Sequence, residues 1–310
     1  MKAIQLHEFG GPENLRLEDA RIPEPRVGEV LVRVAAASVN PVDAKLAKNA
    51  LRGFVTVDLP WIPGADFSGL IVTLGPGIDD FNIGDAVFGS RPTGSQGTSA
   101  EFVAVPASTI ALKPKLLTHV EAASVPIGAL TAWQGLFDHG RLQPGQTVLI
   151  HGGSGGVGTF AVQLAHWKGA NVIATCSAEN LDYVRALGAD EVIDYEITRF
   201  QTVVKHVDLV FDLVGGETLQ NSFGVLAPGG RLVSTVAQPP EAEATKYEVY
   251  ATQMHMEASG PDLAEIAALF DSGAIRTFVT ETYPLERAAE AWHKMAEGHT
   301  RGKIVLEVAA

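Results

Sequence analysis

The sequence predicts an α/β protein in which a doubly wound parallel sheet is inserted into a β-rich domain built from both ends of the chain. Three observations predict this fold class. Short β-branched runs fill the first third, apolar strands alternate with helices in the middle, and strands return in the tail. The length of 310 residues fits two domains, since domains commonly have about 100–200 residues.

The first 120 residues or so are predicted to be mainly β structure. Glycine and proline interrupt the β-branched runs, and such punctuation is typical of a compact barrel or sandwich. The expected strands lie within Gly28–Ser38, Phe67–Gly75, Asp85–Gly89 and Ala100–Pro106.

From Gln146 the pattern changes to near-continuous apolar strands separated by helices, after a helical stretch at Thr118–Gly140. Such strands are typical of a parallel sheet covered on both faces. A further helix is expected at Pro261–Gly273, with proline near its start and glycine at its end.

Strands are expected again at Ala274–Pro284 and Gly302–Val308, with one helix between them. We therefore expect residues 1–122 and 275–310 to form the β-rich domain. Residues 123–274 would form the doubly wound domain.

A glycine cluster lies where the first strand of the insert meets its first helix. Gly153, Gly155 and Gly158 satisfy G-x-G-x-x-G, and the next strand ends at Cys176. Glycine permits a tight turn, the approach of a pyrophosphate and close helix–strand packing, while the helix N-terminus attracts phosphate. A glycine-rich connection without a ligand is the alternative, but the strand–turn–helix–strand setting favours a dinucleotide.

The end of the second strand bears on which dinucleotide binds. NAD enzymes usually carry Asp or Glu there, to accept a hydrogen bond from the ribose 2′-hydroxyl. This chain has Ser177, which leaves room for a 2′-phosphate, although Glu179 is close in sequence. The sequence therefore favours NADPH.

The composition excludes several classes of protein. A net charge of −13 disfavours binding to nucleic acid. The single cysteine, Cys176, excludes an intrachain disulfide and a Cys/His zinc site. No apolar run approaches the roughly 20 residues of a membrane span, and the first residues lack a signal-peptide core. We expect a cytoplasmic protein without metal and without a membrane partner.

A set of motifs resembles one known family from end to end: Ala35–Leu46, Pro60–Gly75, Gly84–Gly89, Gly152–Gly158, Leu187–Tyr195 and Arg301–Val308. The chain resembles the zinc-free branch of the medium-chain dehydrogenase/reductases, and within it the quinone oxidoreductase-like (zeta-crystallin-like) proteins. The resemblance implies a Rossmann domain inserted in a GroES-like catalytic domain and a homodimer. It implies NADPH-dependent reduction of quinones or α,β-unsaturated carbonyl compounds as small-molecule substrates.

The resemblance also implies roles for individual residues. Asn40 and Asp43 would be catalytic and lie near the nicotinamide, and Asn40 and Ala65 replace zinc ligands of relatives. The residues implied to bind the cofactor are Thr131, Gly153, Gly155, Gly156, Val157, Ser177, Tyr195, Val214, Val236 and Lys303.

Structural roles remain open for several of these residues. Asn40 precedes a proline and could shape a turn, while Asp43 could cap a short helix. Packing is the favoured role of His151. Trp61 and Phe54 are expected to form a flat apolar wall for the acceptor. A 2-enoyl thioester reductase and a non-catalytic NADPH-binding sensor are the alternative functions.

Overall fold

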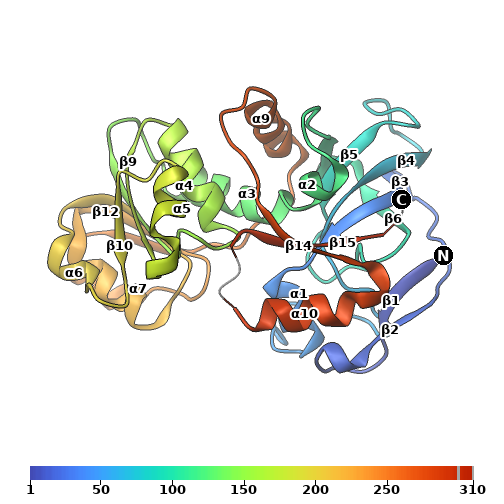
Figure 1. Cartoon of the computed structure of the whole chain (residues 1–310), viewed down its shortest axis with the longest axis horizontal. Helices are drawn as coiled ribbons and strands as arrows, with labels where there is room; N and C mark the ends of the chain where they lie inside the picture. The colour runs from blue at the N-terminus through green and yellow to red at the C-terminus, as the bar shows by residue number, and fades with distance from the viewer. Residues whose placement is uncertain (299–300, 309–310) are drawn as a thin grey trace. The chain divides into compact units, whose positions relative to one another are not determined.

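The computed structural model describes residues 1–298 and 301–308, which form two compact units. Unit 1 comprises Met1–Ile127, Glu257–Gly273 and Thr277–Ala310, and unit 2 comprises Gly128–Met256 and Ala274–Arg276 (Figure 1). The predicted fold class, an α/β insert in a β-rich domain made from both ends of the chain, is confirmed.

The main sheet of unit 1 has the strand order β14-β15-β3-β4-β5-β7, and β6 pairs with β3. Its strands are β3 (Glu29–Ser38), β4 (Asp66–Leu74), β5 (Ala86–Ser90), β6 (Phe102–Pro106), β7 (Ile110–Leu112), β14 (Val279–Pro284) and β15 (Lys303–Glu307). β15 pairs antiparallel with β3, with Val305 opposite Ser38. The C-terminal tail therefore completes a sheet that the N-terminal part begins.

A second, smaller sheet in unit 1 pairs β1 (Lys2–Leu6) with β2 (Leu15–Asp19) in antiparallel fashion. The helical segments of unit 1 are η1 (Pro12–Asn14), α1 (Pro41–Ala47), η2 (Ala107–Thr109), α2 (His119–Ala123), α9 (Gly260–Asp271), η6 (Leu285–Arg287) and α10 (Ala288–Ala296). α10 packs against α1 and β15, and Trp292 and Leu46 share one apolar cluster with Trp61 and Ile304. This cluster fixes α1 beside the end of β15.

Unit 2 contains a parallel sheet with the order β10-β9-β8-β11-β12-β13. Its strands are β8 (Thr147–His151), β9 (Asn171–Cys176), β10 (Glu191–Asp194), β11 (Val207–Asp212), β12 (Leu226–Ser234) and β13 (Tyr250–Gln253). Counted along the chain within unit 2, the order is 3-2-1-4-5-6, as in dinucleotide-binding doubly wound sheets. The order reverses between β8 and β11, and the carboxyl ends of such strands are where ligands bind.

Helices connect these strands and cover the sheet. They are α3 (Pro126–Trp133), η3 (Gln134–His139, a π-helical segment), α4 (Gly158–Trp167), η4 (Ala178–Asn180), α5 (Leu181–Ala186), α6 (Phe200–Val203), α7 (Gly216–Ser222), η5 (Phe223–Val225) and α8 (Glu241–Lys246). α4 packs against β8 and β9, and α7 packs against β11 and β12. Phe200 and Phe223 join Leu149 and Leu232 in one apolar cluster of this unit.

The unit boundaries differ from the expected ones at α9. The sequence pattern places this helix at the end of the α/β insert, but its contacts place it in unit 1, against β7 and η2. A Cβ atom added at Gly260 would lie 2.5 Å from the carbonyl oxygen of Ile110, so the backbones approach very closely there. Connectivity alone does not reveal this packing partner.

Candidate active site

The glycine-rich segment between β8 and α4 forms a tight turn in unit 2. β8 ends at His151, Gly152 has a φ of +76°, and α4 begins at Gly158 with Val157 as its N-cap. A positive φ favours glycine because other residues are strained there. Gly152 therefore makes the left-handed turn, one residue before the first glycine of the predicted G-x-G-x-x-G pattern.

The glycines of this segment differ in the space around them. A Cβ atom added at Gly158 would lie only 2.1 Å from the carbonyl oxygen of Gly152, so α4 starts in direct contact with the turn. A Cβ atom added at Gly153 would lie 3.1 Å from the Cβ of Ala174. At Gly155 the nearest atom would be 3.5 Å away. Gly158 thus serves close packing, whereas Gly155 leaves open space above the loop.

The backbone of the same loop offers hydrogen-bond donors. Within residues 1–298 and 301–308, the N–H groups of Gly156 and Val157 have no hydrogen-bond partner. They precede the first turn of α4, where the helix dipole is positive. Free N–H groups in this position fit the phosphates of a dinucleotide.

Val214 and Val236 lie at the carboxyl ends of β11 and β12 and are 52% and 42% exposed. A Cβ atom added at Gly152 would lie 3.5 Å from Cγ2 of Val214, so the loop after β11 adjoins the glycine turn. A Cβ atom at Gly215 would lie 2.9 Å from Cγ1 of Val236. The structure therefore brings these predicted residues together where the strand order reverses.

A buried carboxylate shapes these two loops. Asp212 Oδ1 accepts hydrogen bonds from the N–H groups of Val214 and Gly215, at 3.1 and 2.9 Å. Its Oδ2 accepts from the Ser234 hydroxyl at 2.7 Å, and Ser234 Oγ in turn accepts from the Val236 N–H at 3.2 Å. Asp212 and Ser234 were not predicted as site residues. The signal that could have found them is a polar residue closing an otherwise apolar strand.

Ser177 follows β9 directly, and the residue is 7% exposed. Its Oγ accepts a hydrogen bond from Asn180 Nδ2 at 2.8 Å. Since a hydroxyl both donates and accepts, the Ser177 proton stays available to a ligand oxygen. Tyr195, 53% exposed, follows the adjacent strand β10, and its N–H donates to the Cys176 carbonyl at 3.2 Å.

Thr131 has a different environment from the exposed members of the predicted set. It lies in α3 and is 7% exposed.

His151, also in unit 2, is fully buried between the hydroxyls of Thr175 and Ser222, at 3.2 and 3.1 Å. Burial lowers the pKa of His151 to about 4, so its ring is neutral near pH 7. This is the packing role that the sequence favours.

In unit 1, a buried polar cluster forms around Asp66, the first residue of β4. Asp66 is 0% exposed, and its Oδ2 accepts hydrogen bonds from Ser38 Oγ at 2.8 Å and Asn40 Nδ2 at 3.0 Å. Its Oδ1 accepts from the Ile127 N–H at 2.9 Å. The Lys303 ammonium lies 3.5 Å from Oδ2 and also donates to Asn40 Oδ1. Asp66 therefore joins segments that are far apart in sequence.

Asp43 completes the cluster and also holds the start of α1. Its carboxylate accepts hydrogen bonds from the N–H groups of Asn40 and Gly64, at 3.2 and 3.3 Å. The first of these closes a capping box at the N-terminus of α1, with Asn40 as the N-cap. The capping role left open for Asp43 is thus present in the structure, and Asn40 is the N-cap residue of the same helix.

The cluster has two carboxyl groups for one ammonium group, and all are buried. Burial, reinforced by the charge of Asp66, raises the pKa of Asp43 to about 7. Burial likewise raises the pKa of Asp66 and lowers that of Lys303, although Asp66 and Lys303 favour each other's charged form. A proton on Asp43 would leave one ion pair, between Asp66 and Lys303.

The structure brings Asn40, Asp43 and Lys303 together, although Lys303 was expected on the cofactor rather than in this cluster. Asp66 was missed as a site residue. The signal for it in the sequence is an acidic residue opening an apolar strand, in "GADFSG".

The expected flat wall made of Trp61 and Phe54 is wrong. Trp61 is 2% exposed, belongs to the apolar core of unit 1 and donates its indole N–H to the Ser95 carbonyl at 2.9 Å. Phe54 is 87% exposed. Burying the Trp61 indole removes a large apolar area from water, which stabilises the core of unit 1. The sequence does not show which of the two aromatic rings is buried.

Over residues 1–298 and 301–308, no group of three or more His, Cys, Asp or Glu side chains is arranged to hold a metal ion. In the same part of the chain, no helix has the length and apolar character needed to cross a bilayer.

Known families and proteins similar to this chain show which class of protein it belongs to. The family described as an alcohol dehydrogenase GroES-like domain matches residues 26–115, and that described as a zinc-binding dehydrogenase matches residues 187–306. The chain is 36% identical to "NAD(P)H oxidoreductase RTN4IP1, mitochondrial" of Mus musculus, over 99% of this chain and 89% of that protein. It is 32% identical to "NADPH-dependent alkenal/one oxidoreductase, chloroplastic" of Arabidopsis thaliana, over 99% and 79%.

Among solved structures, the quinone oxidoreductase from Coxiella burnetii superposes with a TM-score of 0.91 at 34% identity, covering 100% of this chain and 99% of that one. The fold, the glycine turn and these relatives define an oxidoreductase that uses a nicotinamide cofactor. The chain belongs to the medium-chain dehydrogenase/reductase family, and within it to the quinone oxidoreductase-like proteins.

Proposed function

We propose that the protein transfers hydride from NADPH to quinones or α,β-unsaturated carbonyl compounds without a zinc ion. The observation that carries this proposal is the phosphate-binding turn with its open space at Gly155, in a chain similar to a quinone oxidoreductase and an alkenal/one oxidoreductase. Ser177 at the end of β9, where NAD enzymes place a carboxylate, supports NADPH.

Residues of unit 2 would hold the cofactor, which supplies the hydride when bound. The N–H groups of Gly156 and Val157 would bind the pyrophosphate, and Ser177 and Tyr195 would meet the 2′-phosphate. Val214 and Val236 would flank the cofactor with exposed apolar surface, and Asp212 holds the loops that carry them. Gly153 and Thr131 would support the loop and the cofactor from the protein side.

Residues of unit 1 would act on the acceptor oxygen. Hydride addition to an enone leaves negative charge on this oxygen, and fixed polar groups stabilise such charge best in a dry site. Asn40 and Lys303 are both held in place by Asp66. We assign polarisation of the acceptor to this pair, and water remains the source of the proton that completes enone reduction.

The test is an assay with a naphthoquinone and with a short enone, each with NADPH and with NADH. Turnover with both acceptors and a preference for NADPH are the expected results. Asn40→Ala and Thr131→Ala should lower turnover while the far-UV circular dichroism stays unchanged. Full rates in both variants on every acceptor would refute the residue assignment.

The same assay, with a short 2-enoyl thioester as a third acceptor, separates the alternatives. A 2-enoyl thioester reductase would use thioesters far better than small enones, and a sensor would bind NADPH without turnover on any acceptor. A homodimer and a cytoplasmic location also stay predictions, and the relatives from Mus musculus and Arabidopsis thaliana are named as mitochondrial and chloroplastic.

A further inference from the structure

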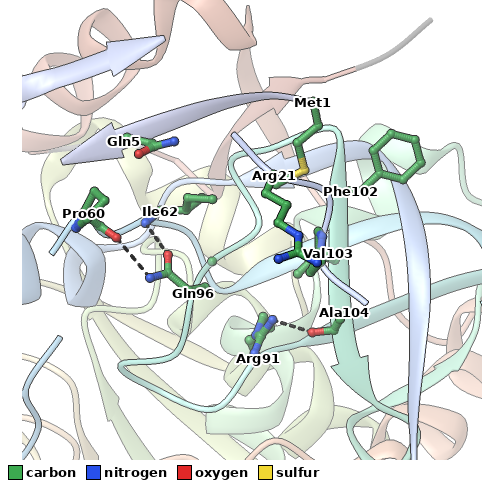
Figure 2. Close-up of a pocket in the computed structure, with 12 residues that line it drawn as sticks. Met1, Gln5, Arg21, Pro60, Ile62, Arg91, Gln96, Phe102, Val103 and Ala104 are labelled. Atoms are coloured by element: carbon green, nitrogen blue, oxygen red, sulfur yellow. Dashed lines mark hydrogen bonds between the residues drawn. The ribbon is translucent and has the colours of Figure 1, made fainter. Parts of the chain in front are cut away.

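We propose that a pocket on unit 1 is a second binding site, for a small organic anion with one apolar ring or a short apolar chain. Figure 2 shows this pocket, whose lining residues all belong to unit 1 and come mainly from the N-terminal segment, the residues after β5, and β6. The proposal does not depend on the proposed reductase activity.

The charge of the pocket is opposite to that of the chain. Arg21 and Arg91 both line it, and none of the described residues that line it is Asp or Glu. The whole chain has 36 acidic residues against 23 Lys and Arg. A concave surface with two guanidinium groups and no carboxylate is therefore unlike the rest of this acidic protein, and it selects anions.

Arg91 is the anchor of the pocket. It is mostly buried, its Nε donates to Ser95 Oγ at 3.0 Å, and its Nη1 donates to the Ala104 carbonyl (Figure 2). These partners are neutral, and no carboxylate among the described residues forms an ion pair with Arg91, although Glu29 is near enough to favour its charge. Two anchored nitrogens fix the planar group, and its remaining N–H groups have no partner there. Burial penalises the Arg91 charge more than Glu29 favours it, and a bound anion would offset that cost.

Two other polar groups line the same pocket. Arg21 lies at the rim, and its bond to Glu24 at 3.0 Å joins two highly exposed side chains, so an anion can compete for it. The Gln5 carboxamide is half-buried and has no hydrogen-bond partner among the described residues. Gln96 is not available, because it accepts from the Ile62 N–H at 2.8 Å and donates to the Pro60 carbonyl at 3.1 Å.

The remaining walls suit an apolar body. Ile62, Phe102 and Val103 face the pocket together with Pro60. The cavity holds about 240 Å³, and a cavity of about 150 Å³ already accommodates benzene. A guanidinium anchor beside apolar walls thus points to an aryl carboxylate or an aryl phosphate rather than to a bare inorganic ion.

Four methionines make the site directly observable, because Met1 lines the pocket and Met254, Met256 and Met295 do not. The protein would be labelled with ¹³C at the methionine methyl groups and titrated with 4-fluorobenzoate, 4-fluorophenyl phosphate and the neutral 4-fluorobenzamide. We expect a saturable shift of the Met1 signal with the anionic probes, and a Kd at least about tenfold weaker for the amide. The anion that binds with the lower Kd, 4-fluorobenzoate or 4-fluorophenyl phosphate, shows whether the site prefers a carboxylate or a phosphate.

Arg91→Met keeps an unbranched side chain and removes the charge, and it should weaken the binding of 4-fluorobenzoate at least about tenfold. Arg26→Met is the matched control, since Arg26 is exposed in the same unit and does not line the pocket. If Arg91→Met does not fold, Arg21→Met at the rim of the pocket tests the proposal instead. It should weaken the binding of 4-fluorobenzoate about threefold.

Some outcomes would overturn the proposal. They are equal affinity for benzoate and benzamide, a shift of other methionines without Met1, unchanged affinity in the foldable arginine variant, or displacement of the probe by NADP⁺. The last result would mean that the probe binds the phosphate site of unit 2. Loss of reductase activity would leave this binding assay unaffected, so the two proposals fail separately.

Discussion

A single carboxyl group, that of Asp43, titrates near neutral pH because it is buried beside a second one. Its pKa is raised to about 7, whereas Asp66, with three hydrogen-bond donors and Lys303 close by, has better compensation for its charge. The proton on Asp43 therefore relieves repulsion inside the cluster. Its release, as pH rises, restores the repulsion between the carboxylates of Asp43 and Asp66.

We expect Asp43→Asn to flatten the pH dependence of unfolding. The carboxyl has a pKa of 3.8 when unfolded and about 7 when folded, so between these values only the folded state keeps the proton. The stabilisation is complete below the lower value and is lost as pH rises through the higher one. The slope for one proton is at most about 1.4 kcal/mol per pH unit. Urea unfolding at a series of pH values measures it.

The exposed carboxyl of Asp80 provides the control. Asp80→Asn should leave the slope as in the parent protein. A parent slope that Asp43→Asn does not change would show that Asp43 is ionised throughout this range.

At Ser177 we expect a change of cofactor preference. Ser177→Asp should move the ratio of kcat/KM for NADPH over NADH towards NADH by at least about tenfold, since a carboxylate repels the 2′-phosphate and accepts from the 2′-hydroxyl. Ser177→Ala separates charge from hydroxyl loss and should lower the ratio without reversing it. An unchanged ratio in Ser177→Asp, with NADH already preferred by the parent, would contradict the assignment.

At the scale of elements, the turn between β8 and α4 makes two separable demands on glycine. Gly158→Ala forces a Cβ against the Gly152 carbonyl, at 2.1 Å in the present backbone, and should destabilise unit 2 by about 1–3 kcal/mol. Gly155→Ala meets nothing closer than 3.5 Å, so stability should stay unchanged while NADP⁺ binds at least about tenfold more weakly. Thermal unfolding and calorimetric titration measure the two effects.

Gly224→Ala is the matched control, because a Cβ there meets only the Tyr247 hydroxyl, at 3.9 Å. It should change neither quantity. If Gly155→Ala bound NADP⁺ as tightly as the parent, the phosphate would not lie above this loop.

Elements with strong periodicity could be predicted from the sequence, and others could not. The apolar runs of β8, β9 and β11 and the glycine turn are local signals and are present as predicted. β13, Tyr250–Gln253, has no apolar run and is defined by its pairing with β12. Two members of the polar cluster, Asn40 and Asp43, could be predicted because they share one sequence motif. Asp66 could not, because it meets them only through tertiary contacts.

At the scale of the whole molecule, the chain divides the work between two compact units. Unit 2 carries the glycine turn that we propose to bind phosphate, and unit 1 carries the polar cluster, each built from contacts within its own unit. One family description names zinc, whereas the sequence resemblance implies that Asn40 and Ala65 replace the ligands of zinc-containing relatives. We expect purified protein to hold less than stoichiometric zinc and to keep its activity after treatment with a chelator. Elemental analysis with a parallel assay checks this, and stoichiometric zinc with loss of activity on chelation would contradict it.

The central claim is that the protein reduces small electrophilic acceptors with NADPH. The most direct measurement is the acceptor-dependent loss of reduced-nicotinamide absorbance, with a naphthoquinone and with 3-penten-2-one, in parent and Lys303→Met proteins of verified fold. We predict turnover of both acceptors by the parent, a higher kcat/KM with NADPH than with NADH, and a lower kcat in Lys303→Met with little change in NADPH affinity. Tight binding of NADPH without oxidation of it by either acceptor would contradict the account.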